Sequence, residues 1–168
     1  MPANFNASEV FEMGIEIEKN GKAFYDEAAK STKDAGVRKV FADLAEWECQ
    51  HIVIFEKLKA SLVGRAQAAA VYDPYNEVQL YIKAAADSHI FLQNTNTKKL
   101  AAECKTSLEA LQIALSFEKD SVVLYRAMEE MVPEDLGHAD VSRIIREELK
   151  HIAIIKAEMA EVSKNEPK

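Results

Sequence analysis

Apolar residues recur every three or four positions along most of the chain, which is the spacing of one helix face. In the first third, one such stripe lies within residues 8–31 and a second within 35–61, with a short polar joint between them. Asn6 and Glu9 have the spacing of a capping box at the start of the first stripe. The pattern predicts two helices that fold back on each other as an antiparallel hairpin.

The last third of the chain repeats this arrangement. Its stripes predict helices over about 107–130 and 138–162, joined by a turn at 133–137 that contains proline and glycine. Thr106 and Glu109 are spaced as a second capping box. Two antiparallel hairpins make an all-α four-helix bundle, in which the second and third long helices are parallel.

The connection between the hairpins, residues 62–105, is longer than the bundle requires. It must run the length of the bundle, about 40 Å, which about 12 extended residues could cover. A short amphipathic helix is predicted around 78–85, and the remainder carries the loop-forming residues Asp73, Pro74, Asn94 and Asn96. The extra length either covers the bundle or lets the second hairpin pair with the first hairpin of another chain.

Composition limits the class of protein. With 168 residues, of which 48% are hydrophobic, the chain can bury one sizeable core, so we expect a single domain over 1–168. The net charge of −7 and the lack of a Lys/Arg-rich stripe argue against nucleic acid as a partner. No segment approaches the roughly 20 apolar residues that span a bilayer, and we expect a cytoplasmic protein with no membrane partner. Cys49 and Cys104 are too few for a disulfide framework, and we expect two reduced thiols.

Candidate chemistry comes from an internal repeat with a constant offset of 100 positions. The first copy contains Glu18, Tyr25, Glu48 and His51, and the second contains Glu118, Tyr125, Glu148 and His151. Five further residues match at the same offset, namely Glu9, Lys19, Ile52, Ile54 and Ala60. Two copies of one hairpin that pack about a pseudo-twofold axis bring their equivalent polar residues together at the centre.

The four repeated glutamates stand at positions where the apolar stripes predict leucine or isoleucine. A single helical glutamate is usually a surface residue. Burying four carboxylates without partners, however, would cost several kcal/mol each, which exceeds what a stability of about 5–15 kcal/mol tolerates. The nearest repeated cations, Lys19 and Lys119, lie about 100° around the helix from the stripe. Two divalent cations would neutralise the four carboxylates.

The Glu-x-x-His pairs at 48–51 and 148–151 each place two metal ligands on one helix face. Carboxylate-rich sites with one imidazole per metal suit iron or manganese, whereas zinc is more often held by thiolates or by three nitrogens. We expect two iron ions, with manganese as the alternative and zinc as a substitute. His89 and His138 lack a glutamate three positions before them and are predicted to be surface or loop residues.

Tyr25 and Tyr125 lie seven residues, or two helical turns, beyond Glu18 and Glu118 and on the same face. Each phenol is predicted to hydrogen-bond a ligand carboxylate across the bundle, which is a common support for metal ligands. The alternative is a core tyrosine whose hydroxyl group is satisfied by any acceptor.

These motifs resemble those of the ferritin-like di-iron carboxylate superfamily, and within it the rubrerythrin-like group. The resemblance covers residues 8–159 apart from the connection between the hairpins. It implies a ferritin-like bundle in which the glutamates of the two Glu-x-x-His pairs bridge the irons. It also implies that Glu18 and Glu118 bind terminally and that one histidine completes each metal.

Proteins of this group reduce hydrogen peroxide, or oxidise Fe(II) with peroxide or dioxygen, by cycling between di-ferrous and di-ferric states. The resemblance therefore implies an oxidoreductase that acts on peroxide or dioxygen. Rubrerythrins proper carry a four-cysteine rubredoxin module, which this chain lacks, so an external electron-donor protein is required. They also carry a glutamate one turn beyond the third helix's ligand, where this chain has Ser121, with Gly21 as its counterpart. The remaining ligand set equally resembles a bacterioferritin-type ferroxidase centre.

Two other functions stay open from the sequence. In one, the protein binds and oxidises Fe(II) as cargo. In the other, it is a non-enzymatic redox-sensing module that changes partners with oxidation state. The long irregular connection disfavours a regular ferritin shell, and we expect a homodimer, with or without exchange of hairpins.

Overall fold

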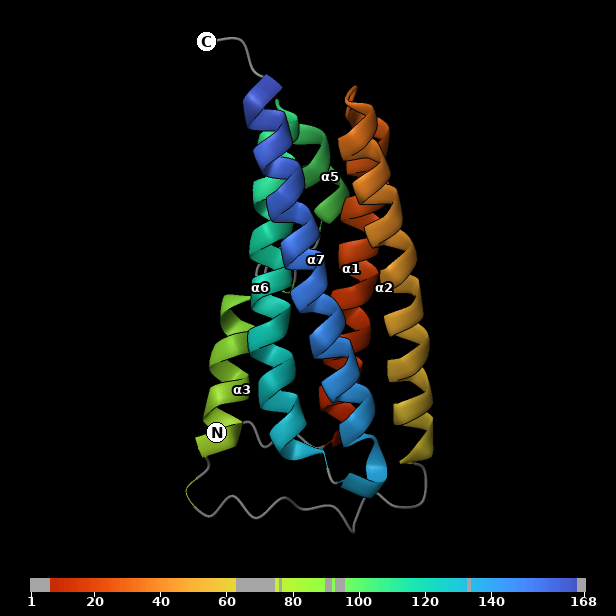
Figure 1. Cartoon of the computed structure of the whole chain (residues 1–168). Coiled ribbons are helices and arrows are strands. Elements are labelled where there is room, and N and C mark those ends of the chain that lie inside the picture. Colours follow the sequence, from red (N-terminus) through yellow and green to blue (C-terminus); the bar gives the residue numbers. More distant parts are fainter. Residues whose placement is uncertain are drawn as a thin grey trace.

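Four long helices run side by side in the computed structural model (Figure 1). The structure describes residues 7–62, 75, 77–89, 92, 96–132 and 134–165. The long helices are α1 (Ala7–Ser31), α2 (Ala35–Ser61), α6 (Ser107–Met131) and α7 (His138–Asn165). Each begins and ends within three residues of its predicted bounds, and the predicted all-α class is confirmed. None of the described helices is both long and apolar enough to cross a lipid bilayer.

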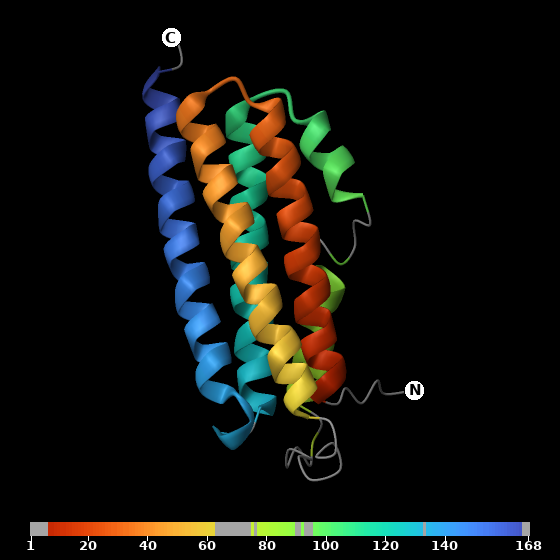
Figure 2. The same cartoon turned by 90° about the vertical axis from the view of Figure 1, so that its right-hand side faces the viewer.

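Two antiparallel hairpins form the bundle. α1 packs mainly on α2, and α6 packs mainly on α7, while smaller contacts between α1 and α6 and between α2 and α7 join the two pairs. Figure 2 shows the four helices running along a common direction. The pairing is the one that the short joints predict, because a joint of a few residues connects spatial neighbours.

Side chains at the joints start the helices that follow them. The Asp34 carboxylate accepts two backbone N–H hydrogen bonds at the start of α2. At the start of α6, the Thr106 hydroxyl accepts from the N–H of Glu109 at 3.1 Å, and the Glu109 carboxylate accepts from the N–H of Lys105 at 2.7 Å. The predicted cap at Thr106 is therefore present. Asn6, part of the other predicted capping box, lies outside the described residues.

Gly137 permits the turn between α6 and α7. Its φ of 109° lies in the left-handed region, which favours glycine, and a Cβ atom there would collide with the Leu58 side chain. A short 3-10 helix, η1 (Glu134–Leu136), comes directly before it. Pro133, also part of the predicted turn, lies outside the described residues.

The connection between the hairpins contains two described helices, whereas the sequence predicted one. α3 (Glu77–Ser88) covers the predicted segment and packs on α6 (Figure 1), and α5 (Thr97–Glu103) packs on α1 (Figure 2). The prediction of a loop at Asn96 is incomplete, because its side chain accepts a hydrogen bond from the N–H of Lys99 and so starts α5. The other predicted loop formers, residues 73, 74 and 94, lie outside the described residues.

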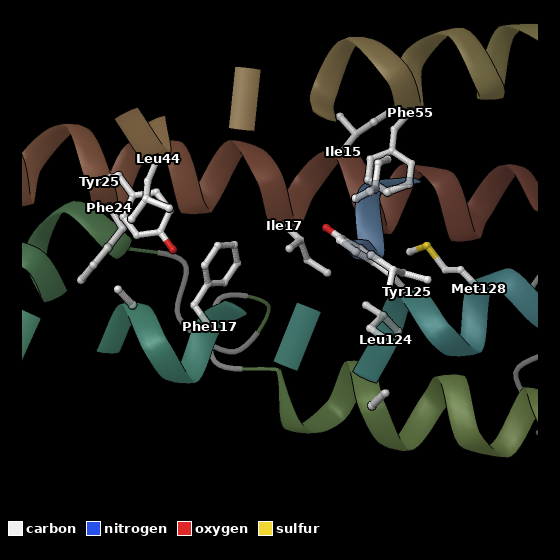
Figure 3. Close-up of a cluster of buried hydrophobic side chains, with 14 of the residues drawn as sticks. Ile15, Ile17, Phe24, Tyr25, Leu44, Phe55, Phe117, Leu124, Tyr125 and Met128 are labelled. Atoms are coloured by element: carbon white, nitrogen blue, oxygen red, sulfur yellow. The ribbon is translucent and has the colours of Figure 1, made fainter. Parts of the chain in front are cut away.

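Aromatic rings of the core gather around two buried tyrosines. The Tyr25 ring centroid lies 5.7 Å from that of Phe117 and 6.0 Å from that of Phe41, and the Tyr125 centroid lies 5.2 Å from that of Phe55. Figure 3 shows the two tyrosines well apart along the bundle, with their hydroxyl groups directed towards the stretch between them. The core thus leaves a polar zone between two aromatic clusters.

Candidate metal centre

Six side chains that can bind metal meet in this polar zone. α1 provides Glu18, α6 provides Glu118, and α2 and α7 each provide a Glu-x-x-His pair. None of the six residues is more than 4% exposed. The structure therefore brings together all six residues that the repeat marked, with a contribution from every long helix.

The six residues form two overlapping groups. Both groups contain Glu48 and Glu148, and each adds one glutamate and one histidine, namely Glu18 with His51 and Glu118 with His151. Within each group, one donor atom from every member lies within 4.8 Å of the others. This overlap is the arrangement that two ions bridged by a pair of carboxylates would need.

Both imidazoles face the carboxylates through Nδ1. His51 Nδ1 lies 2.9 Å from Glu148 Oε1, in a geometry that makes no hydrogen bond, and 3.5 Å from Glu48 Oε2. His151 Nδ1 lies 2.8 Å from Glu148 Oε2 and 3.5 Å from Glu118 Oε2. The two rings stack with their centroids 5.6 Å apart. The Glu148 carboxylate therefore reaches both halves of the cluster.

Several donor atoms of the cluster have no hydrogen-bond partner among the described residues. They are Glu18 Oε2, both oxygens of Glu48, His51 Nδ1, Glu118 Oε2 and Glu148 Oε1. An unpaired buried polar atom costs about 1–3 kcal/mol, and folded proteins contain few of them. Bound cations would satisfy all six atoms at once. The donor set, carboxylates with one imidazole per group, fits iron or manganese better than zinc.

The crowded charges shift pKa values in opposite directions. Burial and the Glu18 charge raise the pKa of Glu48, and burial and the Glu148 charge raise that of Glu118. Burial also opposes ionisation of Glu148, but the close approach of Glu118 and of both imidazoles lowers its pKa. Burial alone would lower the pKa of His151, but the nearby carboxylates outweigh this effect and raise the pKa to about 10. The cluster is therefore a place where added positive charge is favourable.

Each tyrosine donates a hydrogen bond to a glutamate of the opposite hairpin. Tyr25 donates to Glu118 Oε1 at 2.6 Å, and Tyr125 donates to Glu18 Oε1 at 2.5 Å. Burial and the charge of the accepting glutamate raise the pKa of both phenols, so both keep their protons at neutral pH. These crossed bonds orient the two glutamates and tie the hairpins together.

A solved structure has the same architecture. It is a crystal structure of a protein from Thermotoga maritima, assigned to the ferritin-like diiron-carboxylate proteins. It aligns with 94% of this chain and 97% of its own, at a TM-score of 0.66 and 24% sequence identity. The chain has a ferritin-like fold. No protein-family model and no curated protein matches the sequence. At this identity the likeness establishes the fold, and activity has to be inferred from the site.

Just outside the cluster, the two halves of this ferritin-like bundle differ. Glu147 Oε2 lies 3.0 Å from His51 Nε2, and Glu147 Oε1 accepts a hydrogen bond from Arg143. The equivalent position in α2 is Trp47, whose ring stacks on His151. Neither residue follows from the repeat, because the repeat marks what the two halves share. The difference between positions 47 and 147, next to two matched glutamates, is the sequence feature that could have indicated these two residues.

His89 was predicted to be a surface or loop residue, and the prediction of a surface position is wrong. His89 follows α3 directly and is fully buried, with Nε2 3.3 Å from Ser121 Oγ and its ring edge-on to Phe117. Burial lowers its pKa to about 4. The packing of α3 on α6 carries it into the core, which the local pattern could not show. His138 begins α7.

The positions one turn beyond Glu18 and Glu118 offer no further carboxylate. A Cβ atom on Gly21 would lie 2.6 Å from Phe117 Cζ, so the phenylalanine ring fills the space of a side chain there. Ser121 is in contact with His89. Among the described residues, the cluster therefore consists of four glutamates and two histidines.

Proposed function

We propose that the chain binds two metal ions, iron first among them, and acts as an oxidoreductase that reduces hydrogen peroxide or dioxygen. The observation that supports this proposal is the pair of buried donor groups that overlap in Glu48 and Glu148, with six unpaired donor atoms. The ferritin-like fold is compatible with this chemistry but does not by itself select it.

Each ion would have one histidine and one terminal glutamate of its own. Glu18 and His51 would hold one ion, and Glu118 and His151 the other, with the remaining two glutamates shared. Manganese satisfies the same donor set, and zinc can substitute for either metal. Every ligand comes from a long helix, so the bundle itself sets the geometry of the site.

The protein's own residues would hold the two ions and bury the site that they occupy. Two bound irons would supply the two electrons that cleave one O–O bond. Tyr25 and Tyr125 orient the terminal glutamates through their hydrogen bonds and keep a proton beside each of them. Burial of the cluster keeps its charges away from bulk solvent, which strengthens the interactions among them.

Electrons would come from a separate protein. The chain has only two cysteines, and both are free thiols, so it lacks the four thiolates of a rubredoxin-type module. We therefore propose an external electron-donor protein, and a cytoplasmic homodimer as the working form. Exchange of hairpins between the two chains is compatible with the length of the connection.

A ferroxidase is the second candidate, and in that case Fe(II) is the substrate. The observation that favours it is the missing carboxylate one turn beyond the α1 and α6 ligands, where Phe117 fills the space at Gly21. Four glutamates and two histidines are the set that resembles a bacterioferritin-type centre.

Addition of hydrogen peroxide to the anaerobic, Fe(II)-loaded protein separates these functions. An oxidoreductase consumes about one peroxide for every two irons and retains both ions, because each peroxide accepts two electrons. Release of ferric iron or growth of a mineral supports the ferroxidase, and the absence of any reaction contradicts both. The variant His151→Ala should lose one or both ions, and normal binding of two irons by this variant would rule out the proposed site.

A further inference from the structure

The repeat is broken at the position directly before each shared glutamate. This position is Trp47 in α2 and Glu147 in α7, and both residues are half-buried. Each contacts the histidine of the opposite helix, since Glu147 lies beside His51 and Trp47 lies on His151. The two candidate ligand histidines therefore have chemically different outer neighbours.

His51 is held by a carboxylate on its outer side. Its Nε2 lies 3.0 Å from Glu147 Oε2, and Arg143 donates to the other oxygen of Glu147 at 3.0 Å. A carboxylate accepts hydrogen bonds, so the imidazole proton stays on Nε2 and the lone pair of Nδ1 faces the cluster. A bond of this kind fixes the ring and makes it a stronger ligand.

His151 has a ring stack instead. Its imidazole lies against Trp47 at a centroid distance of 4.9 Å and an interplanar angle of 10°. Its Nδ1 faces Glu148, and no residue in the described part of the chain accepts a hydrogen bond from its Nε2. Stacking restricts the tilt of the ring, but it neither selects the tautomer nor raises the basicity of Nδ1.

The His151 side of the cluster is also the accessible one. A cavity of about 250 Å³ opens there, lined by Trp47, Glu147 and His151 among others, and His151 is the one candidate ligand among its lining residues. A cavity that ends at one ligand gives water and small ions a route to that half of the cluster. The crossed hydrogen bonds from Tyr25 and Tyr125 match in the two halves and create no such difference.

We propose that the half-site of Glu18 and His51 binds metal more tightly than the half-site of Glu118 and His151, and that the second ion exchanges through the cavity beside Trp47. Glu147 is then a positioning residue that acts through His51. This inference rests on the proposed two-metal site and adds which ion is retained and which exchanges.

Titration of the metal-free protein with Co(II), followed by visible absorption and calorimetry, tests the inference. We expect two binding steps of different affinity. Glu147→Gln should weaken the tighter step by about 10–100-fold and leave the weaker step unchanged, because a neutral amide accepts more weakly than a carboxylate and changes in a ligand's outer hydrogen-bond partner have effects of that size. Glu46→Gln removes the same charge from an exposed position of α2 and should change neither step.

The converse variant places a carboxylate beside His151. Trp47→Glu should tighten the weaker step and bring the two affinities together, whereas Trp47→Phe retains a ring for stacking and should keep them apart.

Two results would overturn the inference while the two-metal site stands. One is equal affinity of the two steps in the wild type. The other is a Glu147→Gln variant that weakens the weaker step, both steps or neither. Binding of fewer than two ions by the wild type overturns both. Thermal unfolding of each metal-free variant tests whether it is folded. If Trp47→Glu does not fold, the metal titration of Glu147→Gln is sufficient to test the inference.

Discussion

Tyr25 and Tyr125 each use their only donor on a glutamate of the opposite hairpin. Both phenols are fully buried, so no water stands ready to replace either bond. Their acceptors, Glu118 and Glu18, each also carry one of the unpaired oxygens of the cluster. At the scale of single residues, the centre therefore depends on hydrogen bonds that have no substitute.

Removal of one phenol should destabilise the protein. Tyr25→Phe leaves Glu118 Oε1 without its donor, and we expect the free energy of unfolding to fall by about 1–3 kcal/mol. Urea denaturation of the metal-free protein at neutral pH measures the change. Tyr75→Phe is the matched control, because Tyr75 is 79% exposed and its loss should stay within about 0.5 kcal/mol. Equal losses in the two variants would mean that the crossed bond contributes nothing to stability.

Gly21 is needed because Phe117 occupies the space of its side chain. Gly21→Ala would place Cβ 2.6 Å from Phe117 Cζ, and overpacking of this kind costs about 1–3 kcal/mol, of which the better helix propensity of alanine returns about 1 kcal/mol. We expect a net loss of unfolding free energy in the wild-type background. With Phe117→Leu also present, Gly21→Ala should become neutral or stabilising. A double-mutant cycle by urea denaturation measures this coupling, and its absence would contradict the steric explanation.

At the scale of elements, the connection between the hairpins is part of the core. α3 packs on α6 and α5 packs on α1, so each docks on the first helix of a hairpin. His89, directly after α3, reaches Ser121 and Phe117 in the interior. Docking of α3 therefore buries that imidazole, and burial favours its neutral form.

His89 should make stability depend on pH. Burial lowers its pKa to about 4 from an ordinary value of 6.5, so between these values the unfolded chain binds the proton more readily than the folded one. The stabilisation is complete above pH 6.5 and is lost as the pH falls to about 4, with a maximum loss of about 3 kcal/mol.

Comparison of wild type with His89→Gln isolates this contribution. Urea denaturation between pH 7 and pH 4 should show the wild type losing its advantage over the variant as the pH falls. His138→Gln, at the start of α7, controls for the loss of any histidine. A wild-type advantage that stays constant across this range would show that His89 is not the titrating group.

At the scale of the whole molecule, four buried glutamates oppose the apolar core that surrounds them. The core lowers the free energy of the folded chain, whereas the crowded carboxylates raise it until positive charge is added. Binding of metal is therefore coupled to folding, since the two donor groups come together only in the assembled bundle.

Metal should stabilise the fold and its removal should reverse the effect. Each ion that binds only the folded state adds about 2.7 kcal/mol at a free concentration one hundred times its Kd. Thermal unfolding with Mn(II), before and after EDTA, measures the shift.

Glu48→Gln removes one of the four charges, so its metal-free form should be more stable by about 0.5–2 kcal/mol, and it should gain much less from metal. An equal gain in the variant would exclude Glu48 as a ligand.

Much of the fold and of the candidate site was predictable from the sequence. Helix bounds follow from periodicity, which is local, and the pairing into hairpins follows from short joints. The offset of 100 located the six clustered residues, and the seven-residue spacing from Glu18 to Tyr25 predicted crossed hydrogen bonds, because two turns return a side chain to the same helix face.

The sequence by itself determined the four long helices and the matched residues of the centre, since both are written in regular spacings along the chain. Only the tertiary structure decided that His89 is buried, that α5 docks on α1, and that Glu147 and Trp47 give the two histidines different neighbours. The physical reason is that these features depend on contacts between segments far apart in the chain, and such contacts leave no period in the sequence.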